Sequence, residues 1–124
     1  MAYCERHTVS VTTASNGTAT YYTPHVTGRI INVIYTKTDF ADTADFTITV
    51  EGTAQSIWTD TDITASETVA PRQPTHSTAG VASKYDTTDN EPIEDHIWLA
   101  NDRVKIVVAS GGNTKSGTFT AIVS

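Results

Sequence analysis

Alternation of apolar and polar residues marks several stretches of the chain as β-strands. Residues 7–13 place Val9 and Val11 on one side of the backbone and serine or threonine on the other. Residues 46–51 alternate in the same way, and we expect them to pair as a hairpin with 55–59. A period of two buries one face of a strand, whereas an amphipathic helix needs apolar residues three or four apart. These segments are therefore predicted to be half-buried strands.

Other segments predict strands nearer the interior. Residues 28–37 and 103–109 are dominated by valine and isoleucine. A strand that is apolar on both sides belongs in the middle of a sheet, where both of its faces are covered. Residues 118–123 alternate again, so the last strand is expected to be tied into a sheet.

One short turn signal stands out near the start of the chain. Asn16-Gly17 lies between the segments 7–13 and 18–23. Both residue types tolerate positive φ, and this dipeptide is the strongest local signal for a two-residue hairpin. The sequence therefore predicts that 7–13 and 18–23 pair with each other.

The composition agrees with a chain made of strands. Threonine, valine and isoleucine fill 45 of the 124 positions, while leucine occurs once, at Leu99. β-Branched side chains lose rotamer freedom in a helix and pack well on a pleated sheet. We expect one domain over 1–124, an all-β antiparallel β-sandwich of about seven or eight strands, jelly-roll-like or Ig-like, with one long loop. A closed barrel is the alternative.

The long loop is predicted between about residues 65 and 95. Pro71 and Pro74 interrupt the pattern there, and the residues that follow are rich in serine, threonine, alanine, glycine and aspartate. Structureless loops longer than about 12–15 residues are uncommon in a domain of this size, and they are usually functional or disordered. We interpret 65–95 as a contact loop and 1–7 as an N-terminal arm.

Charge and length exclude several classes of partner. The net charge is −6, and the eight basic residues are scattered, with no two adjacent. Nucleic-acid binding needs clustered lysine and arginine, so neither nucleic acid nor an anionic membrane surface is an expected partner.

No apolar run approaches the roughly 20 residues of a membrane-spanning helix. The start of the chain lacks the apolar segment of a secretion signal, and Cys4 is the only cysteine, so the protein is expected in a reducing cytoplasm or to leave the cell by another route.

The residues that could carry chemistry do not form a recognisable motif. Asp39, Asp42 and Asp45 recur at every third position, whereas a calcium loop uses alternating acidic residues and a glycine. The four histidines lie far apart, so no metal site is expected. Asp95 and His96 are adjacent, which predicts opposite faces of a strand and a poor acid–base pair. We therefore expect no catalytic residue and no cofactor.

The two tryptophans are the best candidates for recognition. Trp58 follows Ile57, and Trp98 lies between Ile97 and Leu99, so one residue of each neighbouring pair is expected to face outward. Exposed tryptophan is enriched at protein interfaces. Stacking of these rings on a sugar is the alternative, which leaves a carbohydrate-binding β-sandwich open as a function.

Four segments of the chain resemble proteins of a known kind. They are Met-Ala-Tyr-Cys-Glu-Arg-His at 1–7, the run at 27–40, Thr-Val-Ala-Pro-Arg-Gln at 68–73 and the run at 101–109. The chain is similar to small structural proteins encoded among the head and tail genes of tailed bacteriophages. Such proteins include capsid decoration (cement) proteins, head-closure components and small tail proteins.

The resemblance implies a virion part without enzymatic activity, made and assembled in the bacterial host cytoplasm. A decoration protein binds subunits of the major capsid protein and stabilises the head, and we expect a homo-oligomer, with a trimer as the first guess. A head–tail connector, a tail protein and a carbohydrate-binding domain on the virion surface are the alternatives. The candidate interface residues are Tyr3, Arg6, His7, Trp58, Arg72, His76, Tyr85 and Trp98.

Overall fold

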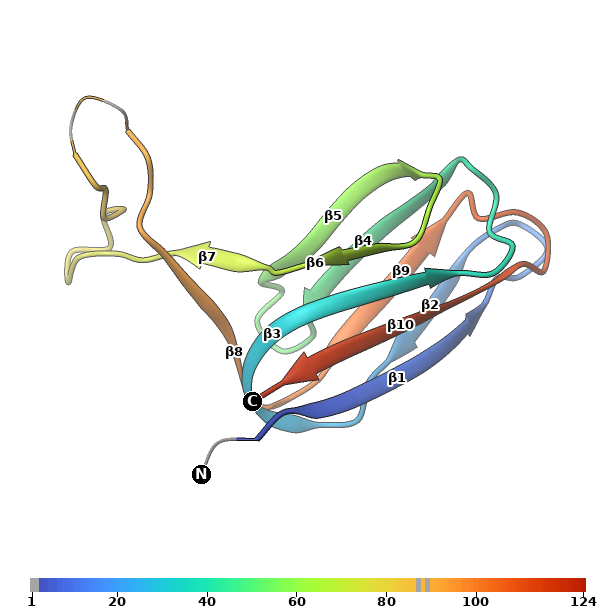
Figure 1. Cartoon of the computed structure of the whole chain (residues 1–124), viewed down its shortest axis with the longest axis horizontal. Coiled ribbons are helices and arrows are strands. Elements are labelled where there is room, and N and C mark those ends of the chain that lie inside the picture. The colour runs from blue at the N-terminus through green and yellow to red at the C-terminus, as the bar shows by residue number, and fades with distance from the viewer. Residues whose placement is uncertain (1–2, 87, 89) are drawn as a thin grey trace.

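Ten β-strands in two antiparallel sheets make up the described part of the chain (Figure 1). The computed structural model describes residues 3–86, 88 and 90–124, and none of these residues is helical. The predicted all-β antiparallel sandwich is therefore confirmed. The strands are β1 (Glu5–Thr12), β2 (Ala19–Tyr22), β3 (Val26–Lys37), β4 (Ala44–Val50), β5 (Ser56–Ile63), β6 (Glu67–Val69), β7 (Arg72–Pro74), β8 (Glu94–Asp102), β9 (Val104–Ala109) and β10 (Ser116–Val123).

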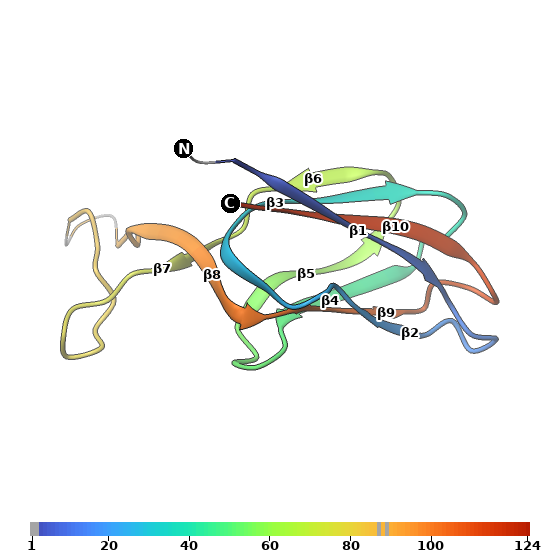
Figure 2. The ribbon, with the colours of Figure 1, turned by 90° about the horizontal axis from the view of Figure 1, so that it is seen from below.

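The two sheets lie face to face. The larger sheet has the order β1-β10-β3-β8-β7, and β6 also pairs with β3. The smaller sheet has the order β2-β9-β4-β5. Figure 2 shows them as two layers, with β1, β10, β3 and β6 in one layer and β2, β9 and β4 in the other. The core therefore lies between two sheets, as in other β-sandwiches.

The strand order identifies the sandwich as a jelly roll. When the three-residue strands β6 and β7 are set aside, four of the strand pairs are β1 with β10, β2 with β9, β3 with β8, and β4 with β5. The first strand of this series thus pairs with the last, the second with the second-last, and so on inward. This is the pattern of a long two-stranded ribbon that folds over into two sheets. Of the two sandwiches expected from the sequence, the structure has the jelly roll. Its two extra strands, β6 and β7, lie inside the predicted long loop.

The predicted hairpin at Asn16-Gly17 is wrong in its pairing, although the turn itself forms. The Ala14 N–H donates to the Thr18 carbonyl at 2.9 Å, and Gly17 has a φ of 82°. Beyond this turn the chain crosses between the layers, because β1 pairs with β10 and β2 pairs with β9. A turn signal determines only the local backbone, and the final strands of the chain supply both partners.

An aromatic cluster fills one part of the core. Phe46 is fully buried, with its ring centroid 4.7 Å from Tyr35, 4.9 Å from Phe119 and 5.4 Å from Trp58. These three pairs are close to edge-to-face except for small tilts, an arrangement that aromatic rings prefer over flat stacking. Phe40 packs on the same group. Four of these five side chains lie on strands, two in each sheet. The cluster therefore joins the two layers.

Candidate interaction surface

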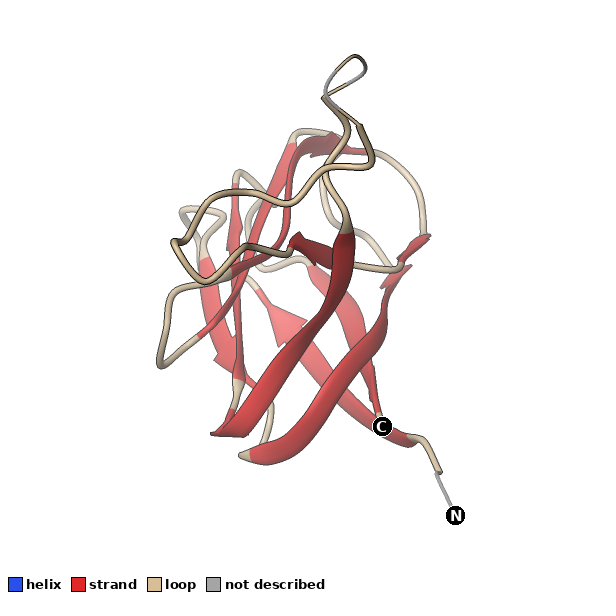
Figure 3. Cartoon of the chain, turned by 90° about the vertical axis from the view of Figure 1, so that its left-hand side faces the viewer, coloured by secondary structure: helices blue, strands red, loops and turns tan. Residues whose placement is uncertain are grey.

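An arm formed by residues 75–93 projects from one end of the sandwich. It leaves the fold through β7 and returns through the first residues of β8, which pair with each other from Arg72↔His96 to Pro74↔Glu94. The arm lies at the left of Figure 1 and toward the viewer in Figure 3. Residues 87 and 89 lie outside the described part of the chain. The predicted contact loop 65–95 is thus β6, β7, this arm and the start of β8.

Backbone hydrogen bonds hold the base of the arm. The Thr75 N–H donates to the Ile93 carbonyl at 2.8 Å, which continues the register of β7 and β8. The Ser83 N–H donates to the Thr75 carbonyl, and the Ile93 N–H donates to the Ser83 carbonyl, both at 2.9 Å. Isolated bridges then join His76 to Ala82 and Lys84 to Pro92. The middle segment of the arm is therefore flanked by the outgoing and returning segments.

The described residues of the arm contribute no side chain to the hydrophobic core. Val81 and Tyr85 are 64% and 72% exposed. Ordering a residue costs about 1–2 kcal/mol of backbone entropy, and an isolated hairpin is marginally stable in water. The arm thus has hydrogen bonds but little apolar burial, and contact with another surface would stabilise it.

A groove lies near the base of the arm. It is open, has a volume of about 450 Å³ and includes both Tyr3 and Trp98 in its wall. Trp98 is 60% exposed on β8, whereas its neighbours Ile97 and Leu99 are buried. The groove is lined by Tyr3, Glu5, Thr27, Arg29, Trp98, Val123 and Ser124.

Charged groups of both signs surround the tryptophan. Arg29 lies opposite Trp98 in the pairing of β3 with β8, and Glu5 lines the same groove. The pKa of Asp95 is lowered, first by the hydrogen bond from the His96 N–H and then by the His96 ring, with a smaller contribution from Arg29. The groove therefore combines aromatic surface with the Arg29 cation and the Glu5 carboxylate, and Asp95 lies outside its lining.

The side chains of Asp95 and His96 meet, which corrects the expectation that they face apart. The Asp95 Oδ1 accepts the His96 backbone N–H at 2.7 Å and lies 3.2 Å from the His96 Nδ1. Alternation fixes the direction of each Cβ, but a carboxylate can still turn back onto the next peptide group. This contact is local and exposed, and it belongs to the base of the arm.

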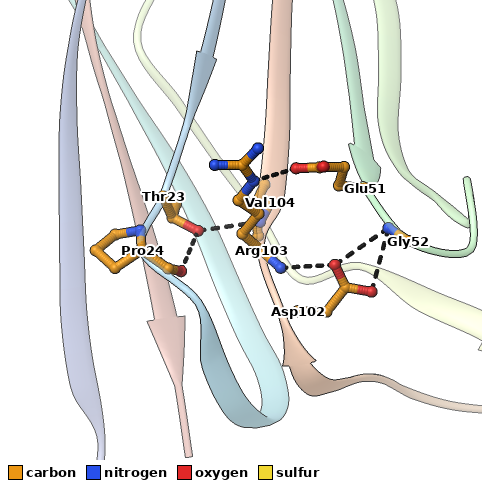
Figure 4. A network of polar contacts seen from close by, with 7 residues as sticks. All are labelled: Thr23, Pro24, Glu51, Gly52, Asp102, Arg103 and Val104. Atoms are coloured by element: carbon orange, nitrogen blue, oxygen red, sulfur yellow. Dashed lines mark hydrogen bonds and ion pairs between the residues drawn. The ribbon is translucent and has the colours of Figure 1, made fainter.

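A polar network ties together a corner of the sandwich (Figure 4). The Asp102 carboxylate accepts the N–H of Gly52 at 3.1 Å and that of Arg103 at 2.8 Å. The Arg103 guanidinium donates to the Glu51 carboxylate and lies 3.9 Å from the centroid of the Tyr22 ring. The hydrogen bond with Arg103 lowers the pKa of Glu51, and the same bond raises the pKa of Arg103. The turn after β4 is thereby held against the corner between β8 and β9.

Thr23 completes this corner from the buried side. Its hydroxyl accepts the Val104 N–H at 3.0 Å and lies 3.0 Å from the Pro24 carbonyl oxygen, to which it donates (Figure 4). Buried backbone donors need such partners, since leaving one unpaired costs about 1–3 kcal/mol. We assign this network a structural role, because its bonds connect parts of the same fold.

The structure leaves most of the predicted interface residues accessible. Six are exposed and His7 is half-buried, with its Nε2 3.2 Å from the Glu5 carboxylate. The structure brings Tyr3 and Trp98 together in the groove and places His76 and Tyr85 on the arm. Arg72 starts β7, and Arg6 lies on β1. The predicted N-terminal arm 1–7 is only partly an extension, because β1 begins at Glu5 and residues 1–2 lie outside the described residues.

Trp58 is the predicted interface residue that the structure contradicts. Its side chain is only 8% exposed and packs against Phe46. Ile57 is buried as well, because the register shifts between the pairs Ile48↔Trp58 and Thr49↔Ser56 and leaves Ile57 as an extra residue. A β-bulge of this kind breaks alternation, so two consecutive side chains can both enter the core.

Sequence reasoning missed the polar part of the groove. Arg29 lies in a segment that was predicted only as a central strand, and Thr27 precedes it. The available signal was an arginine at the start of an apolar run, since charged side chains are rarely placed in a core without a partner. The alternation pattern alone could not bring Tyr3 and Trp98 together, because they are far apart in the sequence.

No group of three or more histidine, cysteine, aspartate or glutamate side chains is placed to hold a metal ion in the part of the chain that the structure describes. Among the same residues there is no helix of the length and apolarity needed to cross a membrane.

The chain was also compared with known proteins. Comparison with protein-family models, with curated proteins and with solved structures yields no match.

Proposed function

We propose that this chain is a non-enzymatic structural protein of a tailed-bacteriophage virion, which decorates the head by binding subunits of the major capsid protein. The arm at 75–93 is the observation that carries this proposal. It projects from the sandwich, exposes Val81 and Tyr85, and contributes no described side chain to the core. An element of this kind gains stability when it lies against another protein, which is what an assembly subunit requires.

The fold and the sequence resemblance add separate support. Jelly rolls recur in viral capsid domains and in lectins, so the fold agrees with a virion role by analogy. The segments at 1–7, 27–40, 68–73 and 101–109 carry the resemblance to phage structural proteins. The protein would be made in the host cytoplasm and then act in the virion. A head–tail connector or tail protein is the alternative position, and the copy number per virion separates the two, since a head decoration is present in many copies.

Removing the arm should abolish binding to the capsid while the jelly roll stays folded. Replacing residues 76–92 by Asn-Gly keeps the Thr75–Ile93 pair and closes it with a two-residue turn. Because no described arm residue belongs to the core, the unfolding free energy should change by less than about 1 kcal/mol. We expect at least a hundredfold weaker binding to capsids that lack this protein, measured by co-sedimentation.

The matched control is Thr20→Ala, an exposed substitution on the other sheet, which should bind as the parent does. The double variant Val81→Ala with Tyr85→Ala should reproduce most of the loss without any deletion. A shortened protein that is folded by circular dichroism and binds capsids with unchanged affinity would contradict the proposal.

A carbohydrate-binding function is the second candidate, and the groove favours it. Tyr3 and Trp98 offer exposed aromatic faces, while Arg29, Glu5 and Thr27 supply donors and acceptors beside them. Small-ligand sites commonly combine apolar walls with a few polar groups that fix orientation. A glycan array tests this: a specific signal that Trp98→Ala abolishes and Tyr22→Ala retains would establish a sugar site, and the absence of any signal would remove this candidate.

A further inference from the structure

The edges of the two sheets are not equally protected against strand addition. The edge strand β2 has four residues and is followed closely by Pro24. The edge strand β5 contains two register shifts and carries Asp60 and Asp62. The short β7 follows Pro71 and ends at Pro74. Short length, bulges, charge and proline are the devices by which natural sheets block pairing with another chain.

β1 has none of these protections over most of its length. Its eight residues pair with β10 in unbroken register, and it contains no proline. The last five residues, 8–12, carry no charge. Among the residues that the structure describes, no strand pairs with β1 on the side away from β10. β1 is therefore a long, regular and open edge.

The backbone groups on the outer side of this edge can be assigned. The Thr13 N–H donates to the Lys115 carbonyl at 2.8 Å, and this pair continues the register of β1 with β10. Direction alternates along an antiparallel strand, so odd-numbered residues of β1 face β10 and even-numbered ones face away. The Thr12 carbonyl does point away, since it accepts the Tyr21 hydroxyl at 3.4 Å. The outward-facing backbone groups thus belong to residues 6, 8, 10 and 12.

We propose that β1 pairs antiparallel with β1 of a second copy, about a twofold axis at Val9. In this register Thr8 pairs with Ser10 of the other copy, and Arg6 pairs with Thr12. All four outward-facing residues of each strand are then hydrogen-bonded. Shifting the axis to Thr8 or to Ser10 leaves an outward-facing residue of β1 without a partner inside the other β1.

The side chains of β1 suit a second copy. Arg6 and Glu5 of each copy face Thr12 and Thr13 of the other, so no like charges are opposed. On the inner face, Val9 meets Val9, a half-buried side chain that packs on the core and would be covered further. Cross-strand pairs of this type contribute about 0.2–1 kcal/mol each. The closed twofold contact gives a dimer instead of the trimer guessed from the sequence. This inference does not depend on the proposed virion role.

Solution mass and a cysteine scan test the pairing. The intact protein should have twice its 13.3 kDa chain mass by light scattering. In a Cys4→Ser background, Val9→Cys should form an intermolecular disulfide on mild oxidation, because directly opposed residues of this kind have Cα atoms about 4.5 Å apart. Thr12→Cys is the matched control: its two copies would lie about 20 Å apart, too far for a disulfide.

A disrupting variant completes the test. Ser10→Pro removes an N–H that points away from β10, so the monomer should keep its fold while the dimer is lost. Ser10→Ala should stay dimeric. A monomeric parent protein overturns the proposal, and so does a trimer or a dimer in which Val9→Cys fails to cross-link. Equal cross-linking at Val9 and Thr12 overturns the register and with it the assigned axis.

Discussion

Phe46→Ala is expected to destabilise the protein by about 4 kcal/mol, since removing a buried phenylalanine from a packed core costs about 3–5 kcal/mol. Phe46 is fully buried and contacts aromatic rings from both layers, including Tyr35, Phe119 and Trp58. Truncation removes its apolar burial and leaves a cavity between the sheets. Domains have total stabilities of about 5–15 kcal/mol, so a large fraction of the margin would be lost.

Urea unfolding followed by tryptophan fluorescence in a Trp98→Phe background, which leaves Trp58 with its ring centroid 5.4 Å from that of Phe46, measures this change. Tyr85→Ala is the control, because it truncates an aromatic side chain that is mostly exposed on the arm and should alter stability by less than about 0.5 kcal/mol. Equal effects of the two substitutions would mean that the aromatic cluster does not hold the layers together.

Raising the pH from 10 to 12 should remove about 2 kcal/mol of stability through Tyr35 alone. Burial, and secondarily the charge of Asp39, raises the pKa of Tyr35 from 10.0 to about 12. In the unfolded chain this phenol ionises near pH 10, whereas the folded protein keeps it neutral until about pH 12. The unfolded state loses its proton first, so the stabilisation is complete below pH 10 and is lost as the pH rises to 12.

Tyr35→Phe separates this group from the others that titrate in the same range. The Tyr35 hydroxyl is buried and has no hydrogen-bond partner among the described residues. Since an unpartnered buried hydroxyl is unfavourable, the variant should be about 1 kcal/mol more stable at pH 7. The loss of stability between pH 10 and pH 12, measured by urea unfolding, should shrink by the Tyr35 contribution. An unchanged alkaline dependence would show that Tyr35 ionises normally in the folded protein.

The strands that alternate without interruption were predictable from the sequence. Phe46, Ile48 and Val50 face the core, as does Phe119. Each of these positions follows from a period of two and needs no knowledge of the partner strand. The predicted pairing of 46–51 with 55–59 is also confirmed by β4 and β5, which are close in the sequence.

The candidate surface was predictable only in part. Alternation allowed Trp98 either to face solvent or to face the core, and the structure exposes it. The same rule failed for Trp58, because a β-bulge buries both Ile57 and Trp58. The projecting arm was expected from composition, but its base depends on the pairing of β7 with β8. The groove at Trp98 needs Tyr3 and Arg29 from other segments, so periodicity could not predict it.

By itself the sequence determined which segments form β-branched strands, which faces of those strands are buried and where the arm lies. It also determined that the net charge is acidic and that the charged residues are scattered. The tertiary structure alone decided which strands became neighbours, and therefore that Asn16-Gly17 joins two sheets, that β1 is an open edge and that Tyr3 lies beside Trp98. The physical reason is that side-chain alternation and turn preference act over a few residues. Strand pairing in a jelly roll is instead decided by competition among segments up to the whole chain length apart.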